Sequence, residues 1–339
     1  MNYPSFIKKG STIGVVAPSA GIIDEEKKKL VGSAIENFKK KGIKVVLNPS
    51  VFNCENCVSG SAETRAKEFM DFYLDDSIDA IIAVAGGEFM QEILPFVDFE
   101  KLKNAKPKFF QGMSDNTNLT LTLTTLCDVA TIYGDCFVHF GRKWHDVLNN
   151  QNNFLLGKNK PVKNNKLYQI EDFKSFDDQK RIGYNCTQDV KWKILSGEKE
   201  VRFGGRLIGG CMDMIANLFG TRFDNLLEFC ERYKDDGIVW FVESCDLSVC
   251  DQCRFWWKMR ELGLLKYCKG IIIGRPMHTQ TLKGITYEFA NFCNLKDLNI
   301  PVVIDCDFGH MHPSFHVVCG AMCEIRSFNG KGEIKYLLK

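Results

Sequence analysis

The stretch "PKFFQGMSDNTNLTLTLTTL" (residues 107–126) contains a strand, a corner and a helix in direct succession. The aromatic run "KFF" is typical of a buried strand, and the leucines and threonines after residue 116 predict a helix. Ser114 and Asp115 form the corner between them. Open α/β sheets bind ligands beyond the carboxyl ends of their strands, so Ser114 is expected at a ligand-binding edge.

On both sides of this stretch, strand and helix patterns alternate. Residues 24–42 have the spacing of an amphipathic helix that ends at a glycine, and Ser61 begins a second helix with a capping sequence. The apolar run "DAIIAVAGG" predicts a strand buried on both faces. The expected strands of this half are residues 12–18, 43–48, 79–87, 107–112 and 129–134. Five strands with intervening helices predict a doubly wound parallel sheet.

The rest of the chain has a different character. Residues 142–189 are rich in Asn and Lys and are expected to form a linker or a long loop, and such loops often act as lids. Beyond them, mixed strands and helices end in "VVCGAMCEIRSF" and "GEIKYLL", which are expected to pair as antiparallel strands. Because a single core rarely exceeds roughly 300 residues, we predict two α/β domains. Residues 1–165 form an N-terminal doubly wound domain, and residues 166–339 form a C-terminal, β-rich domain with a mixed sheet.

The charge balance limits the classes of partner. Lys and Arg number 44 against 42 Asp and Glu, a formal net charge of +2, so no overall field favours nucleic acid or an anionic membrane. No apolar stretch approaches the ~18 residues that span a bilayer, and the first residues lack the apolar core of a signal peptide. We expect a cytoplasmic protein that acts on a small molecule, without nucleic-acid or membrane partners.

The cysteines suggest a reducing environment rather than a disulfide framework. Their number, 15, is odd. Two Cys-x-x-Cys pairs are present, at Cys54/Cys57 and Cys250/Cys253, but a structural zinc site needs four converging ligands and nothing in the spacing joins the pairs. The sequence therefore predicts neither a metal ion nor an organic cofactor.

Three residues that follow predicted strands fit together chemically. Ser114 follows "KFFQGM", Glu243 follows "GIVWFV", and His310 follows "VVIDCDFG". A serine hydroxyl needs an imidazole to take its proton, and a carboxylate orients that imidazole. Backbone amides at Gly86, Gly87 and Asp115 are candidate donors to an oxyanion.

Each assignment has a structural alternative. Ser114 is also a suitable N-cap for the helix that follows it, and Glu243 suits a helix N-terminus. His310 competes with His312 and His316 in "GHMHPSFH".

The glycine-rich run "FGGRLIGG" (residues 203–210) raises a nucleotide-binding alternative. Its spacing is loose, the turn after the first strand is "APSAG" rather than GxGxxG, and the second strand ends at Asn48 without an acidic residue. Arg206 in this run is suited to bind a substrate carboxylate or to form a buried ion pair.

Several runs, in order and over nearly the whole chain, resemble the LD-carboxypeptidase family of serine peptidases, which also contains the microcin C self-immunity proteins. These runs are "GVVAPS", "IIAVAGGEFMQEILPFVDFEKL", "KFFQGMSDNTNL", "GRLIGGCMDMIANLFGT", "WFVES", "GIIIGRP" and "DFGHMHP". The resemblance implies a catalytic triad of Ser114, Glu243 and His310, and an oxyanion held by the amides of Gly87 and Asp115. It also implies an N-terminal α/β domain joined to a C-terminal β-rich domain, a triad divided between them, and a homodimer.

The chain departs from the murein-recycling members, which usually have Arg-Gly-Gly-Tyr-Gly where this chain has "AGGEF". This loop and the 142–189 segment are more similar to the immunity branch, in which a tryptophan can stack on a nucleobase. Trp192 and Trp144 are candidates for that stacking or for packed core positions. Gly86, Arg206 and Trp192 are thus candidate substrate contacts.

We therefore expect a serine-type carboxypeptidase or amidase that cleaves an amide bond near the carboxyl end of a small peptide or peptidyl-nucleotide substrate through an acyl-enzyme. The substrate is expected to be a murein-derived tetrapeptide or an aminoacyl-nucleotide antibiotic. The alternative is a catalytically inactive member or a nucleotide-binding module on the same scaffold.

Overall fold

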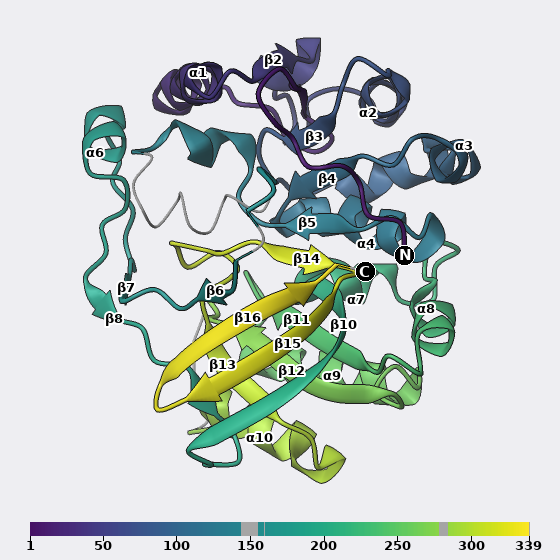
Figure 1. Ribbon diagram of the computed structural model, residues 1–339, viewed down its shortest axis with the longest axis vertical. Coiled ribbons are helices and arrows are strands. Elements are labelled where there is room, and N and C mark those ends of the chain that lie inside the picture. The colour runs from purple at the N-terminus through teal and green to yellow at the C-terminus, as the bar shows by residue number, and fades with distance from the viewer. Residues whose placement is uncertain (144–154, 159, 278–283, 339) are drawn as a thin grey trace.

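The computed structural model describes residues 1–143, 155–158, 160–277 and 284–338, which form two α/β lobes. The first lobe, purple to blue in Figure 1, lies above the green and yellow second lobe. No helix in these ranges is both long and apolar enough to cross a lipid bilayer.

The first lobe is built on a six-stranded sheet in the order β14-β5-β4-β3-β1-β2. Strands β1 to β5 pair in parallel, and β14 pairs antiparallel with β5. Every residue of β3, β4 and β5 is buried, as expected for strands covered on both faces. The strands are β1 (Thr12–Val16), β2 (Lys44–Leu47), β3 (Ala80–Ala83), β4 (Phe109–Gly112), β5 (Thr131–Tyr133) and β14 (Val317–Cys319). The predicted parallel sheet is confirmed, and a strand from the C-terminal part of the chain extends it.

The helices of this lobe begin close to the predicted positions. The Asp24 side chain accepts a hydrogen bond from the amide of Lys27, and Ser61 caps the second helix in the same way through the amide of Thr64. The helices are α1 (Glu25–Lys40), α2 (Ala62–Leu74), α3 (Phe99–Asn104) and α4 (Thr117–Leu126), with 3-10 helices η1 (Pro49–Phe52), η2 (Met90–Phe96), η3 (Ser114–Asn116) and η4 (Phe137–Gly141).

The second lobe contains an eight-stranded sheet in the order β6-β16-β15-β10-β11-β12-β13-β9. The β10 to β13 pairings are parallel and the others are antiparallel, so the predicted mixed sheet is confirmed, as is the final pairing of β15 with β16. Its strands are β6 (Val162–Lys163), β9 (Lys193–Ile194), β10 (Glu200–Cys211), β11 (Ile238–Glu243), β12 (Cys268–Gly274), β13 (Val302–Cys306), β15 (Met322–Phe328) and β16 (Lys331–Leu337). Its helices are α7 (Met212–Leu218), α8 (Leu226–Arg232), α9 (Val249–Glu261), α10 (Tyr287–Leu295) and η5 (Lys296–Leu298).

Helix α4 joins the two lobes. Its residues 117–125 are all buried although five of these nine are threonines, because the Thr122, Thr124 and Thr125 hydroxyls donate to carbonyls four residues earlier. At its first turn, Thr117 accepts a hydrogen bond of 3.1 Å from the amide of Cys211 at the end of β10. A Cβ at Gly210 would lie 2.7 Å from the Thr117 side chain, so a glycine is required for this close approach. The helix that follows Ser114 is thereby fixed to the second lobe.

The segment predicted as a linker or long loop contains short regular elements in its described part. These are β6, which pairs with β16, a small sheet of β7 (Leu167–Tyr168) and β8 (Gln188–Asp189), and helix α6 (Phe176–Arg181). The amide of Phe176 donates to Glu26, which ties α6 to α1. The segment thus connects the two lobes along one side of the molecule (Figure 1).

Candidate active site

Ser114 occupies a strained corner between β4 and η3. Its φ of +62° lies in the left-handed region, which is costly for a residue other than glycine and is frequent at functional sites. Its amide donates to the hydroxyl of Tyr133 at 3.3 Å. Neither η3 nor α4 has a side-chain cap, so helix capping does not account for a serine here.

Gly86 lies directly against the Ser114 side chain. A Cβ at residue 86 would lie 3.1 Å from the Cβ and 3.4 Å from the Oγ of Ser114. The glycine therefore leaves the hydroxyl open to the adjacent cavity, and a side chain at this position would crowd it.

Glu243 and His310 form a buried pair at the end of the second sheet. Glu243 is the last residue of β11 and is fully buried, and its Oε2 lies 2.8 Å from His310 Nδ1. Gly309 makes this approach sterically feasible: its φ is +98°, and a Cβ there would lie 2.6 Å from the same Oε2. Because Nδ1 is engaged with Glu243, Nε2 is the ring nitrogen of His310 that can exchange a proton with a group in the cavity.

The charges of this pair stabilise each other. Burial alone lowers the pKa of His310, but the Glu243 carboxylate raises the pKa well above its usual value. Burial raises the pKa of Glu243, and His310 reverses this, so the net pKa of the carboxyl is lowered. By contrast, burial lowers the pKa of His316 to about 3 and that of His312 well below its usual range. Of the three histidines in "GHMHPSFH", His310 is the one with a carboxylate partner at hydrogen-bonding distance.

Tyr133 connects the serine corner to this pair, and sequence reasoning did not identify it. The Tyr133 hydroxyl donates to Glu243 Oε1 and accepts from the amide of Ser114. Tyr133 is the last residue of β5, whereas Glu243 ends β11, so the contact crosses between the lobes. The position of Tyr133 at the carboxyl end of a parallel strand was the available signal in the sequence.

The loop that carries His310 is held from behind by a second buried ion pair. Arg275 lies 2.8 Å from Asp307, and it also donates to the carbonyl of Met311 at 3.2 Å. The indole of Trp192 donates to Asp307 at 2.9 Å. Arg275 is the conspicuous charge in the "GIIIGRP" run and was not selected from the sequence.

Of the two expected oxyanion donors, Asp115 directly follows Ser114 in the chain, and Gly87 lines the same cavity as Ser114. The Asp115 amide is in the first turn of η3, where helical geometry provides no acceptor. The Asp115 carboxylate accepts hydrogen bonds from Ser19 and from the amide of Met90 at 2.8 Å. This carboxylate therefore fixes the loop that contains Gly87 relative to the serine corner.

Ser114 and His310 line one cavity of about 380 Å³, together with Gly86 and Gly87. The side chains of Ser114 and His310 do not hydrogen-bond directly to each other in the described structure. An adjoining cavity of about 650 Å³ continues from His310 toward α1 and residues 169–179. The described part of the 142–189 segment thus forms one wall of the space beside His310.

Two predicted substrate contacts lie outside these cavities. Arg206 binds Asp236 at 2.8 Å and the carbonyl of Gly320 at 2.7 Å, and it stacks on Tyr233. The contact with Asp236 is the ion pair expected from the sequence as the alternative role of Arg206. Trp192 is 2% exposed and packs in the core. Trp144 lies outside the described residues.

The fold and this cavity define the class: a two-domain α/β protein whose site takes a serine from the first lobe and a histidine–glutamate pair from the second. Comparison with known families is more specific. Residues 13–134 match the LD-carboxypeptidase N-terminal domain, and residues 204–325 match the LD-carboxypeptidase C-terminal domain. The chain belongs to the LD-carboxypeptidase family, which supports a peptidase-like hydrolase function.

Individual relatives cover nearly the whole chain. YocD of Bacillus subtilis (strain 168), provisionally named a carboxypeptidase, is 26% identical over 98% of both chains. The microcin C7 self-immunity protein MccF of Escherichia coli is 24% identical over 93% of this chain and 90% of its own length. The crystal structure of an MccF-like protein from Bacillus anthracis str. Ames superposes with a TM-score of 0.83 at 24% identity, with full coverage of both chains. This structural likeness establishes the fold.

Proposed function

We propose that this protein is a serine hydrolase that cleaves an amide bond in a small peptide-like substrate through an acyl-enzyme. The observation that carries the proposal is the 2.8 Å pair of Glu243 and His310 on the same cavity as the strained Ser114. Serine is a weak nucleophile until a base takes its proton, so a hydroxyl and a carboxylate-oriented imidazole in one cavity form a chemically complete set.

In the first half of the reaction, the Oγ of Ser114 attacks the substrate carbonyl while its proton passes to Nε2 of His310. Glu243 holds the ring through Nδ1 and stabilises the imidazolium that forms. The tetrahedral intermediate collapses as His310 returns the proton to the leaving amine, which departs and leaves an ester on Ser114.

In the second half, His310 takes a proton from water, and the resulting hydroxide attacks the ester. The carboxylic product leaves as the proton returns to Ser114. The amides of Gly87 and Asp115 donate to the oxyanion in both tetrahedral states, a role that commonly contributes about 3 kcal/mol per donor. The Ser114 hydroxyl and the His310 ring do not hydrogen-bond directly to each other in the described structure. Bound substrate is therefore expected to bring them into contact.

The relatives suggest two substrate classes. One relative, from Bacillus subtilis (strain 168), is named a probable murein peptide carboxypeptidase. MccF has been solved in complex with aspartyl sulfamoyl adenosine. A murein peptide and aspartyl sulfamoyl adenosine both contain an acyl–nitrogen bond, which is the bond that the proposed mechanism breaks, and both also carry a charged group.

The cavity offers a cation for such a group. Lys27 lines both parts of the cavity and forms no ion pair with a described residue, whereas Arg142 is already paired with Asp172. We assign to Lys27 the binding of a substrate carboxylate or phosphate-like group. A Lys27→Met variant is then expected to raise KM several-fold while kcat changes little.

The test is to incubate the purified protein separately with a murein tetrapeptide and with aspartyl sulfamoyl adenosine. Release of D-alanine or of free sulfamoyl adenosine identifies the substrate class. Ser114→Ala is expected to abolish the release, and Ser33→Ala, at a buried serine on α1, serves as the matched control. Turnover that survives Ser114→Ala would contradict the proposal.

A further inference from the structure

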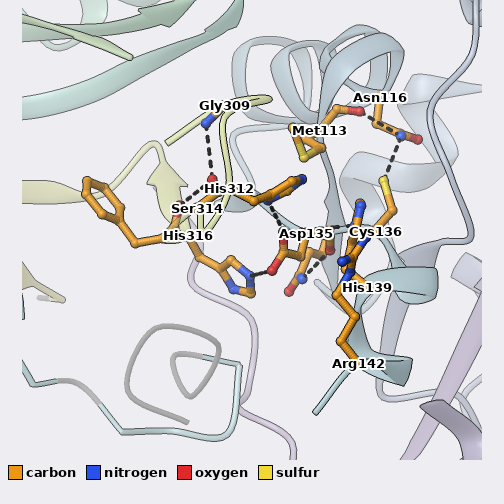
Figure 2. A network of polar contacts seen from close by, with 12 residues as sticks. Met113, Asn116, Asp135, Cys136, His139, Arg142, Gly309, His312, Ser314 and His316 are labelled. Carbon is orange, nitrogen blue, oxygen red and sulfur yellow. Dashed lines mark hydrogen bonds and ion pairs between the residues drawn. The ribbon is translucent and has the colours of Figure 1, made fainter. Parts of the chain in front are cut away.

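A second group of histidine and carboxylate side chains lies beside the serine cavity. Asp135 follows β5, His139 is four residues later on η4, and His312 lies two residues after His310. Figure 2 shows the histidine rings gathered around the Asp135 carboxylate. The mechanism above uses none of these three residues.

Their separations do not match hydrogen bonds. Nδ1 of His312 lies 3.5 Å from Asp135 Oδ1, and Nδ1 of His139 lies 3.9 Å from the same oxygen. An N–H···O bond spans about 2.7–3.2 Å. Two ligands that are each about 2.1 Å from a shared tetrahedral ion lie roughly 3.4 Å apart. The three ligand atoms lie within 4.8 Å of one another, so a shared ion requires the His139 ring to move closer to the other two ligands.

The histidine nitrogens that face Asp135 are also available as ligands. Nδ1 of His139 and Nδ1 of His312 are buried and make no hydrogen bond within the described part of the chain. A buried ring nitrogen without a partner is costly, so a ligand or ordered water is expected there. Neutral imidazole and carboxylate are preferred ligands of Zn²⁺ and related ions.

We propose that Asp135, His139 and His312 bind a divalent transition-metal ion such as Zn²⁺ or Co²⁺. His139 and His312 line the same cavity as Ser114, so the remaining coordination positions open toward the substrate space. The site is therefore placed to bind water or an anionic group of a molecule in the cavity.

The surroundings are arranged to hold these ligands. The side-chain amide of Gln111 donates to the Asp135 carbonyl at 2.7 Å, and the Tyr184 ring stacks on His312 with centroids 5.3 Å apart. Contacts that surround the ligands in this way fix their orientation in metal sites. The neighbouring cation, Arg142, is paired with Asp172 through both of its terminal nitrogens, which reduces its repulsion of a metal ion.

The cysteine pairs noted in the sequence are the competing ligands. Within the described ranges, neither pair belongs to a group of three converging ligands. Cys57 is exposed and Cys54 is partly exposed, so they are still able to bind added metal. A test must separate the thiols from the histidines.

The test is titration of the full-length, metal-free protein with Co²⁺, followed by visible absorption and equilibrium dialysis. One equivalent is expected to bind with the d–d bands of a nitrogen–oxygen site. His139→Asn/His312→Asn should weaken binding at least tenfold. Cys54→Ser/Cys57→Ser and Cys250→Ser/Cys253→Ser should retain both the bands and the affinity.

The proposal is overturned if the wild type binds no Co²⁺, if the double histidine variant binds like the wild type, or if only the cysteine variants lose binding. Should the double variant fail to fold by circular dichroism, Asp135→Asn, which preserves side-chain shape, gives the same readout. Because binding is measured without turnover, the result does not depend on the proposed hydrolase activity.

Discussion

The cavity contains two histidine–carboxylate groups that differ in geometry. His310 and Glu243 are joined at 2.8 Å, and the resulting charge interaction raises the pKa of His310. His312 and Asp135 are 3.5 Å apart, and burial lowers the pKa of His312. A hydrogen-bonded imidazole is suited to exchange protons, whereas a neutral imidazole is suited to donate its lone pair. Residues of the same type, two positions apart, are thus prepared for different chemistry by distance and charge.

The largest expected effect separates these two histidines directly. His310→Asn should lower kcat/KM by about 10³-fold or more, because the base is removed. His312→Asn should stay within about tenfold of the wild type. Steady-state assays of both variants on the same substrate measure the difference, and equal losses would mean that the two histidines do not have separate roles.

Glu243→Gln tests the carboxylate side of the catalytic pair. We expect a loss of about 10³-fold, together with a change in pH dependence. In the wild type, activity requires neutral His310, so kcat/KM should rise as pH increases through a pKa above 6.5. Removal of the Glu243 charge leaves burial, which lowers the pKa, so the acid limb should move to lower pH. An acid limb that stays in place would show that Glu243 does not control the base.

Tyr133→Phe should have an intermediate effect. It removes the hydroxyl that donates to Glu243 and accepts from the Ser114 amide, a contact that exists only when the lobes are docked. We expect roughly a tenfold loss of kcat and about 1–3 kcal/mol of the free energy of unfolding. Removing a hydrogen-bond donor to Glu243 should also raise the pKa of that carboxyl. A merely structural tyrosine would lower stability and leave the pH profile unchanged.

Arg206→Lys should have the smallest effect on turnover. It replaces a forked guanidinium that binds Asp236 and Gly320 and does not line the cavity, so about 1–2 kcal/mol of stability should be lost. Thermal unfolding measures that loss, and KM should stay at the wild-type value. A several-fold rise in KM would instead indicate that Arg206 contacts the substrate.

Local sequence patterns were sufficient where a residue's role depends on its own element. The strand before Ser114, the buried run at residues 79–87 and the capped helix after Ser61 follow from periodicity and turn chemistry. The candidates Ser114, Glu243 and His310 follow from the rule that ligands bind beyond the carboxyl ends of strands, because each is predicted at or just after the end of a strand.

Local sequence patterns do not predict contacts between segments that are distant in the sequence. Strand β14 joins the first sheet although its sequence lies in the second half, because pairing of β14 with β5 depends on how the lobes dock. The sequence left two roles open for Arg206 and Trp192, substrate contact or buried structural position, because local sequence does not show that Asp236 and Asp307 lie beside them. The gathering of Asp135, His139 and His312 likewise requires the lobes to be together.

Activation of Ser114 by His310 can be measured without a known substrate, by labelling with a fluorophosphonate probe. We expect a single adduct that maps to Ser114 by mass spectrometry, with labelling lost in Ser114→Ala, strongly slowed in His310→Asn, and retained in His312→Asn. An unlabelled wild type, or an adduct on another serine with Ser114→Ala still reactive, would contradict it.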